Sequence, residues 1–248
     1  MQAKKSFSLL SQREKVKERQ SEGERPLTYI LMAGGPLHLV PSLSVMKEQY
    51  PKATWIGVDR GVFELLSAGI EPTEAFGDFD SLTEEERDWV ENTKTRLRIY
   101  PCEKDETDME IALSWVLEQN PSQVILLGAT GGRLDHLFMN AQLLAKGLPE
   151  HIPVYLQDRW NKVTMLAPGE YTVTKSDYRY VSIIPVPKQV TGLNLTGFRY
   201  ELTDARIEAG SSLCISNEIA ERRGEISFEK GEIYLFQSKD EGNSLDQS

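Results

Sequence analysis

The first half of the chain alternates between short apolar runs and segments with helical spacing of apolar residues. Strand-like runs occupy residues 27–33, 53–59, 97–101 and 123–128. Helical spacing or helix-capping residues mark 42–49, 61–69, 81–92, 108–120 and 133–147. Strands that alternate with helices in this way form a parallel sheet with helices on both faces. We therefore predict an α/β domain over residues 27–149.

The pattern changes after about Leu148. A series of short strand-like runs follows, from IPVYLQ at 152–157 to EIYLF at 232–236, and Gly, Pro, Asn and Asp separate them. This spacing is typical of an all-β sandwich or barrel, and no helical pattern of useful length interrupts it. We predict an all-β sandwich domain over residues 150–240, with a short tail at 241–248.

The composition indicates a folded protein with an acidic surface. Hydrophobic residues make up 40% of the 248 residues, enough for a full core, and the net charge is −10 at pH 7. A general nucleic-acid binder needs a basic surface, so we expect no nucleic-acid partner. Phosphorylated small molecules are not excluded, because a metal or a local basic patch binds those. Residues 1–26 differ from the rest by being basic and poor in large apolar residues, and we predict a mobile tail there.

Cysteine usage and hydropathy favour the cytoplasm. Cys102 and Cys214 lie far apart and lack metal-ligand spacing, which argues against a disulfide framework and a structural zinc site. No apolar run approaches the ~20 residues that span a bilayer, so we expect no membrane partner.

The segment GDFDSL (77–82) carries the first candidate chemistry. Asp78 and Asp80 are two residues apart at the predicted end of a strand, where side chains with this spacing point to the same side. Paired carboxylates repel each other unless a cation lies between them, and Mg²⁺ suits such a pair together with substrate phosphates. A loop with an Asx-turn and a helix cap at Ser81 explains the same residues, and this pattern alone leaves both interpretations open.

A second acidic group precedes the helix predicted at 108–120. Thr107 and Glu110 have the spacing of a capping box, which places Asp108 in the first turn and Asp105 just outside it. Complementation of the helix dipole explains acids in a first turn. It does not explain Lys104 beside Asp105 on the carboxyl side of a strand, where open α/β sheets bind ligands.

The third group is a glycine-rich loop, GATGGR at 128–133, between a buried strand and a helix. Such a loop presents backbone N–H groups and a helix N-terminus to phosphate, and Arg133 adds a guanidinium fork. It is neither a Walker A sequence nor a complete G-x-G-x-x-G fingerprint. Asp135 and Asn140 follow on the helix and are expected to line the same cavity.

Acidic residues follow one predicted strand after another. Asp59 ends the strand at 53–59, and Gly61 opens the next helix. We expect Asp59, Asp78, Asp80, Asp105 and Asp108 to converge at one edge of the sheet. So many carboxylates imply Mg²⁺ with a polyphosphate.

In order and spacing, VDRG (58–61), GDFDS, KDETD (104–108) and GATGGRLDH resemble the thiamine pyrophosphokinase family, especially its bacterial form, over about residues 28–240. The resemblance implies an α/β catalytic domain followed by a β-sandwich, assembled as a homodimer. It also implies transfer of diphosphate from ATP to thiamine, giving thiamine diphosphate and AMP, with Mg²⁺. The implied ATP-binding residues are Asp59, Gly61, Asp105, Thr107, Thr130, Gly131, Gly132, Arg133, Asp135 and Asn140.

The resemblance extends to ISNEI (215–219), where it implies that Ser216 and Asn217 bind thiamine across the dimer interface. The residues alone fit an ordinary Asn-containing turn equally well. Some relatives pack a tryptophan near the C-terminus on thiamine. Tyr234 and Phe236 stand in that region here, so the stacking residue is left open, with Trp160 as an alternative.

For catalysis, we expect Asp78, Asp80 and Asp108 to hold Mg²⁺, with Asp80 accepting the hydroxyl proton. Lys104 or Arg133 would offset charge on the leaving phosphate. One alternative is a haloacid dehalogenase-type phosphohydrolase using the D-x-D pair. Against it, residues 72–77 do not form a strong hydrophobic strand, and Leu82 replaces the usual Thr or Val. A non-catalytic thiamine or nucleotide sensor would lack the acidic set, which is intact here.

Overall fold

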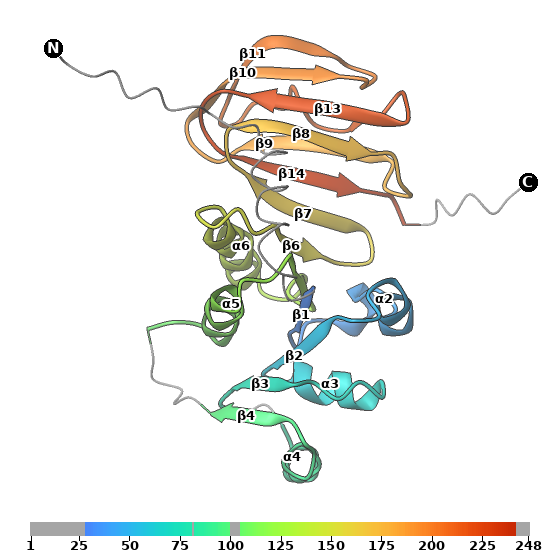
Figure 1. Ribbon diagram of the computed structural model, residues 1–248, viewed down its shortest axis with the longest axis vertical. Helices are drawn as coiled ribbons and strands as arrows, with labels where there is room; N and C mark the ends of the chain where they lie inside the picture. The colour runs from blue at the N-terminus through green and yellow to red at the C-terminus, as the bar shows by residue number, and fades with distance from the viewer. Residues whose placement is uncertain (1–27, 81, 100–104, 242–248) are drawn as a thin grey trace, which may run out of the picture.

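One sheet of ten strands runs through the molecule, and helices cover both faces of its first half (Figure 1). The computed structural model describes residues 28–80, 82–99 and 105–241. The strands of this half are β1 (Tyr29–Met32), β2 (Thr54–Val58), β3 (Glu74–Gly77), β4 (Arg96–Ile99) and β5 (Val124–Leu127). They are parallel in the order β5-β1-β2-β3-β4, which confirms the predicted α/β architecture.

The helices divide between the two faces of this parallel sheet. They are α2 (Leu43–Gln49), α3 (Gly61–Ser67), α4 (Glu84–Glu91), α5 (Asp108–Glu118) and α6 (Leu134–Leu143), with short 3₁₀ turns η1 (Leu37–Leu39) and η2 (Leu144–Gly147). Figure 1 shows α2 and α3 on one side of the strands and α5 and α6 on the other. No helix within the described ranges is long and apolar enough to cross a membrane.

The sheet continues unbroken into the second half of the chain. Its further strands are β6 (Val154–Gln157), β7 (Asn161–Leu166), β9 (Tyr180–Pro185), β12 (Asn217–Glu218) and β14 (Ile233–Ser238). β6 pairs in parallel with β5 and antiparallel with β7, so the predicted limit at 149/150 lies within one sheet. The domain limits therefore stay predictions. Residues 1–26 and 242–248 of the predicted tails lie outside the described residues.

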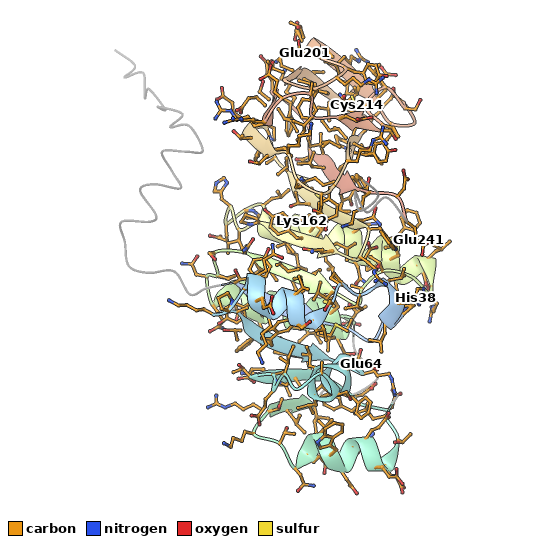
Figure 2. The ribbon with its side chains drawn as sticks, turned by 90° about the vertical axis from the view of Figure 1, so that its right-hand side faces the viewer. His38, Glu64, Lys162, Glu201, Cys214 and Glu241 are labelled. Atoms are coloured by element: carbon orange, nitrogen blue, oxygen red, sulfur yellow. The ribbon has the colours of Figure 1, made fainter. Side chains whose placement is uncertain are left out.

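A second, antiparallel sheet completes the β-sandwich predicted for the second half. It contains β8 (Gly169–Thr174), β10 (Gln189–Thr196), β11 (Leu202–Glu208) and β13 (Arg223–Phe228), in the order β11-β10-β13-β8. An apolar cluster that includes Ile183, Leu235, Leu193 and Ile226 joins it to the large sheet. Figure 2 shows Lys162 of β7 between the helix-covered region around Glu64 and the second sheet around Glu201 and Cys214.

Strand β3 corrects one expectation, because residues 74–77 form a buried strand between β2 and β4. Glu74 conceals this strand in the sequence. Its side chain is buried because the carboxylate accepts from Arg98 Nε at 2.8 Å, which compensates for the lost hydration. The weak-strand argument against a dehalogenase-type site was therefore wrong.

One of the short strand-like runs of the second half, SLCIS at 212–216, was predicted as a strand but forms a turn that leads into β12. The Ile215 amide donates to the Ser212 carbonyl at 3.1 Å, so it is not available to a neighbouring strand. Cys214 is buried, and its carbonyl accepts from the Ile183 amide at 2.9 Å. Cys214 thus packs in the sandwich core, whereas Leu213 and Ile215 are exposed.

Alternate residues of the central strands form two separate cores. Leu31 of β1 and Leu126 of β5 pack with α5 and α6 in one cluster. Ile30 and Ile125 point to the other face and pack with Met46 of α2 and other residues. Because both faces are covered, these strands have continuous apolar runs rather than an apolar–polar alternation.

Close backbone contacts fix the carboxyl edge of the sheet. A β-carbon at Gly61 would overlap the Met32 carbonyl, so α3 begins directly against the end of β1. A β-carbon at Gly35 would similarly overlap the Gly128 carbonyl, and the Gly35 amide donates to that carbonyl at 2.8 Å. The turns after β1, β2 and β5 are therefore held together by backbone contact.

We expect Gly61→Ala to destabilise the protein by about 3 kcal/mol or more, because backbone atoms must move to admit the methyl group. Gly69→Ala is the control. Gly69 has a φ of 69° and no atom within 4 Å of an added β-carbon, so its cost is limited to about 1 kcal/mol of backbone strain. Urea denaturation measures both values. Equal costs would show that the contact with Met32 does not constrain the fold.

Candidate active site

A cavity of about 800 Å³ lies at the carboxyl ends of β1, β2 and β5. It is bounded by the turn after β1, the end of β2, the start of α5 and the loop from β5 to α6. The predicted site residues that line it are Asp59, Asp105, Thr107, Asp108, Thr130, Gly131, Gly132, Arg133 and Asn140. Three motifs that are far apart in the sequence thus meet in one place.

The cavity also has residues outside the predicted site. Gly34 and Gly35 line it after β1, Glu106 lines it before α5, and His136 lines it from α6. The position of Gly34 and Gly35 at the end of a strand could have identified them from the sequence. His136, which the sequence suggests is a packing residue, has no neighbouring partner in the sequence that would have marked it as lining the cavity.

Asp59 stands where β2 passes into α3, with a φ of 49°. Left-handed backbone is unusual for a non-glycine residue and typical of functional turns. The Asp59 amide donates to the Phe76 carbonyl at 2.8 Å. A β-carbon at Gly77 would overlap Asp59 Oδ1, so the carboxylate lies directly beside the end of β3. Gly61, in contrast, does not line the cavity and has the packing role described above.

Asp78 and Asp80 flank a buried anchor. The Phe79 side chain packs in the cluster of Val62 and Val90, and its backbone is left-handed with a φ of 57°. The Asp80 amide donates to Asp78 Oδ1 at 3.1 Å, which is the Asx-turn that the sequence left open. The two aspartates follow β3 in a turn rather than extending the strand. They do not line the 800 Å³ cavity.

The two carboxylates are close enough to influence each other. Hydrogen bonding to Asp78 and repulsion from its charge raise the pKa of the Asp80 carboxyl, and the charge of Asp108 acts in the same direction. The Arg87 guanidinium opposes this shift. The three predicted metal ligands are therefore electrostatic neighbours, although two of them belong to the turn after β3 and the third begins α5.

The start of α5 only partly follows its prediction. Thr107 Oγ1 accepts from the Glu110 amide at 3.2 Å, and Asp108 is the first helical residue. The Glu110 carboxylate pairs with Lys146 of η2 at 2.9 Å, so it supports the contact between α5 and the end of α6. Lys104, predicted to neutralise phosphate charge, lies outside the described residues.

The loop from β5 to α6 is held by Asn140. Gly128, Gly131 and Gly132 all have positive φ angles, and the Asn140 amide donates from Nδ2 to the Ala129 carbonyl at 3.0 Å. Arg133 forks onto the Asp135 carboxylate, with Nε 3.1 Å from Oδ1. This pairing holds the pKa of Asp135 below its usual range. Both side chains are largely exposed, so the guanidinium is free to exchange Asp135 for a phosphate.

A second cavity of about 980 Å³ adjoins the first at Thr130 and Gly131. It is largely apolar and lies over α6, β6, β7, β9 and β14. Tyr234 and Phe236 line it, as do Phe138 and Ile184. Trp160 does not line it.

Ser216 and Asn217 do not line either cavity. Asn217 is buried, and its side chain accepts from the Tyr200 amide at 3.0 Å and donates to the Tyr200 carbonyl at 2.7 Å. Ser216 donates from its backbone to Ser182 Oγ at 2.9 Å. β12 is separated from β5 by five strand spacings in the sheet order, or about 24 Å.

No three His, Cys, Asp or Glu side chains among residues 28–80, 82–99 and 105–241 are grouped closely enough to hold a metal ion by themselves. The predicted set of Asp78, Asp80 and Asp108 is thus not a complete metal cage in this structure. Any ion at this edge needs further ligands from a substrate.

Two family models match successive parts of the chain. Residues 47–156 match the family model described as thiamin pyrophosphokinase, catalytic domain. Residues 170–233 match the model described as thiamin pyrophosphokinase, vitamin B1 binding domain. The thiamine pyrophosphokinase of Bacillus subtilis is 46% identical over 86% of this chain and 99% of its own length.

Solved structures show the same likeness. The crystal structure of the Bacillus subtilis thiamine pyrophosphokinase aligns with a TM-score of 0.79 at 44% identity, covering 86% of this chain and 99% of that one. The Geobacillus thermodenitrificans thiamin pyrophosphokinase gives a TM-score of 0.79 at 44% identity, covering 87% and 99%. The yeast enzyme shares the fold, with a TM-score of 0.71 at 12% identity and 89% of each chain covered.

The two-part α/β and β-sandwich fold, with its acidic and glycine-rich edge, defines an ATP-dependent diphosphotransferase. The chain belongs to the thiamine pyrophosphokinase family.

We expect Asn140→Asp to raise the KM for ATP roughly tenfold, because a carboxylate cannot donate to the Ala129 carbonyl and the glycine loop loses its tie to α6. Steady-state kinetics at varied ATP measures this. Asn120→Asp, at the far end of α5, is the matched control. An unchanged KM for ATP would show that the tie does not shape the nucleotide cavity.

Proposed function

We propose that the protein transfers the terminal diphosphate group of ATP to the hydroxyl of thiamine, releasing AMP. The observation that carries this proposal is the convergence of Asp59, Asp108 and the glycine loop 128–133 in one cavity. Its walls combine backbone N–H groups, which suit phosphate, with carboxylates, which suit a cation between protein and phosphate.

In this proposal, ATP lies along the glycine loop, with its phosphates directed toward the turn after β3. Gly131 and Gly132 leave the backbone accessible, and Asp59, Asp105 and Thr107 line the opposite wall. Asn140 acts indirectly, through its hydrogen bond to the loop. Arg133 leaves its pair with Asp135 and binds the phosphate that departs with AMP, where it offsets the negative charge.

The donor set fits Mg²⁺. Asp78, Asp80 and Asp108 offer hard oxygen ligands, and Asp78 and Asp80 lie close enough to repel each other without a cation. Among the described residues, no three ligands form a closed cage. Mg²⁺ tolerates this, because it is usually held by one or two carboxylates and completes its coordination with substrate phosphates and water. When bound, Mg²⁺ neutralises phosphate charge and favours in-line displacement.

The protein's own contribution is position and proton transfer. The Asp78–Asp80 turn orients the carboxylates, and the buried Phe79 keeps that turn in place. We assign Asp80 as the acceptor of the thiamine hydroxyl proton, as the oxygen attacks the β-phosphorus and the bond to AMP breaks. Lys104 keeps its proposed role beside the phosphates.

We propose that the aromatic rings of thiamine bind in the adjoining apolar cavity. It meets the nucleotide cavity at Thr130 and Gly131, so a hydroxyl directed through that junction would face the phosphates. Tyr234 and Phe236 supply flat aromatic surface there. This leaves Ser216 and Asn217 about five strands away from the loop after β5 within one chain.

A homodimer resolves that separation. Ser182 and Ile184 alternate on the same face of β9, and Ile184 lines the apolar cavity. Ser216 binds Ser182 Oγ, so it stands at the far end of this face. Phe138, Ile184 and Val186 line the apolar cavity and expose apolar surface. We propose that two subunits pair through this face about a two-fold axis, so that Ser216 and Asn217 of one subunit approach the glycine loop of the other.

The other two interpretations find no support in the comparisons. A dehalogenase-type phosphohydrolase shares the D-x-D pair after a buried strand, but the matched families and structures are thiamine pyrophosphokinases. A thiamine or nucleotide sensor would need no acidic edge. We also propose the cytoplasm as the site of action, where ATP and reduced cysteines are available.

The reaction is tested by ³¹P NMR of the protein with ATP, Mg²⁺ and thiamine. We expect AMP and thiamine diphosphate to form only when thiamine is present. Asp78→Asn and Asp80→Asn should lower kcat at least about 100-fold, because the negative charge on the transferred diphosphate is then less well stabilised. Asp88→Asn, an exposed acid on α4, is the control. Phosphate or ADP released without thiamine would contradict the proposal, as would normal turnover by either variant.

The shared site is tested with mixed dimers. We would co-express Asp80→Asn and Ser216→Arg chains with different tags and purify the species that carries both. Each parent should be inactive. A site built from two subunits leaves one intact site in the mixed dimer, so about half of the wild-type activity should return. An inactive mixed dimer, or a monomer by sedimentation, would rule out this arrangement.

A further inference from the structure

Helix α4 is joined to the turn that carries Asp59 by a charged fork. Arg60 follows Asp59 directly, and its guanidinium pairs with both oxygens of Glu86: Nη2 is 2.8 Å from Oε1, and Nη1 is 3.1 Å from Oε2. The Glu86 side chain is only 15% exposed. A bidentate pair fixes orientation as well as distance, because the planar guanidinium meets two carboxylate oxygens at once.

The same first turn of α4 holds the turn that carries Asp78 and Asp80. Arg87 Nη2 donates to the Phe79 carbonyl at 2.8 Å, between the two aspartates. Glu86 Oε2 accepts from the Thr83 amide at 2.9 Å, within the capping box that starts the helix. A rigid link therefore runs from Asp59 through Arg60 and α4 to the D-x-D turn.

Both members of the pair also make local contacts. Arg60 Nε lies 3.3 Å from Glu64 Oε1 of α3, and Glu86 belongs to the capping box of α4. These contacts lie within single helices and do not explain why the pair joins two elements. The pair lies outside both cavities. Most of the apolar support for α4 comes from Val90 and the Phe63–Trp89 edge-to-face contact. A pair between partly exposed side chains adds little to stability, but it sets the position of the helix relative to Asp59.

We propose that Arg60 and Glu86 are positioning residues, which hold the Asp59 turn and the Asp78–Asp80 turn at the separation that the reaction requires. This inference rests on the proposed function of those aspartates. Small misplacements of a reacting group reduce rate strongly even when binding is retained. Loss of the fork should therefore impair turnover and metal use rather than the folding of the chain.

The experiment compares Arg60→Met, Glu86→Gln and the double variant with the wild-type chain. Arg60→Met removes the fork and leaves the capping box intact, whereas Glu86→Gln keeps an acceptor for the Thr83 amide. Arg206→Met is the matched control, because it removes another exposed ion pair, with Glu208 on β11. Thermal unfolding is measured for every variant.

We expect each single variant to lower kcat about tenfold and to raise the Mg²⁺ concentration for half-maximal rate, with the KM for thiamine unchanged. The double variant should be no less active than Arg60→Met, because all three variants lose the fork and Arg60→Met already removes the pair of Arg60 with Glu64 as well. Calorimetric titration of Mg²⁺ with a non-hydrolysable ATP analogue should show weakened binding in the same variants. Arg206→Met should match the wild type in every measurement.

Turnover like that of Arg206→Met would overturn the inference, and so would losses that multiply in the double variant. A loss of activity that only follows a lower unfolding temperature would assign the pair a structural role and would also overturn it. The proposed function is judged separately, by thiamine-dependent AMP formation in the wild-type protein. If that reaction occurs while the Arg60 and Glu86 variants behave normally, only the positioning role fails.

Discussion

The parallel hydrogen-bond ladder from β5 through β1 and β2 to β3 is the constraint on which the rest of the molecule depends. Because these strands run in the same direction, the turns after them all meet at one edge. The contact of Gly61 with the Met32 carbonyl and that of Gly35 with the Gly128 carbonyl then fix three of those turns against one another. The backbone geometry thus positions Asp59 and the glycine loop before any side chain contributes.

Sequence patterns predicted most of the α/β half, because its apolar runs and its motifs were both clear. Continuous apolar runs at β1, β2 and β5 marked strands with two covered faces, and the motifs that follow those strands marked the edge. β3 was missed because a buried glutamate looks polar until its partner Arg98 is known, and that arginine stands 24 positions later. Long-range compensation of this kind leaves no local signal.

The β-sandwich fold of the second half was predicted, but the way it connects to the first half was not. Short strands and turn residues indicated a sandwich, yet nothing local showed that β6 would extend the parallel sheet. Likewise, the spacing of Asp78 and Asp80 left a strand end and an Asx-turn both open, and the structure has the Asx-turn. The spacing indicated that the two side chains are close but did not determine the backbone. The role of Asn217 in holding Tyr200 was also beyond the sequence, because it depends on a contact with a bend 17 positions earlier.

The unbroken sheet has a consequence for motion. Val124, Ile125 and Leu126 of β5 lie in register with Val154, Tyr155 and Leu156 of β6, and bending the two halves apart would break this ladder in the middle of the core. Within the described residues, the junction of β5 and β6 is therefore not a hinge of the kind by which many two-domain transferases close over their substrates. We expect closure over the substrates to come from the turns at the sheet edge, with the two halves keeping their relative position.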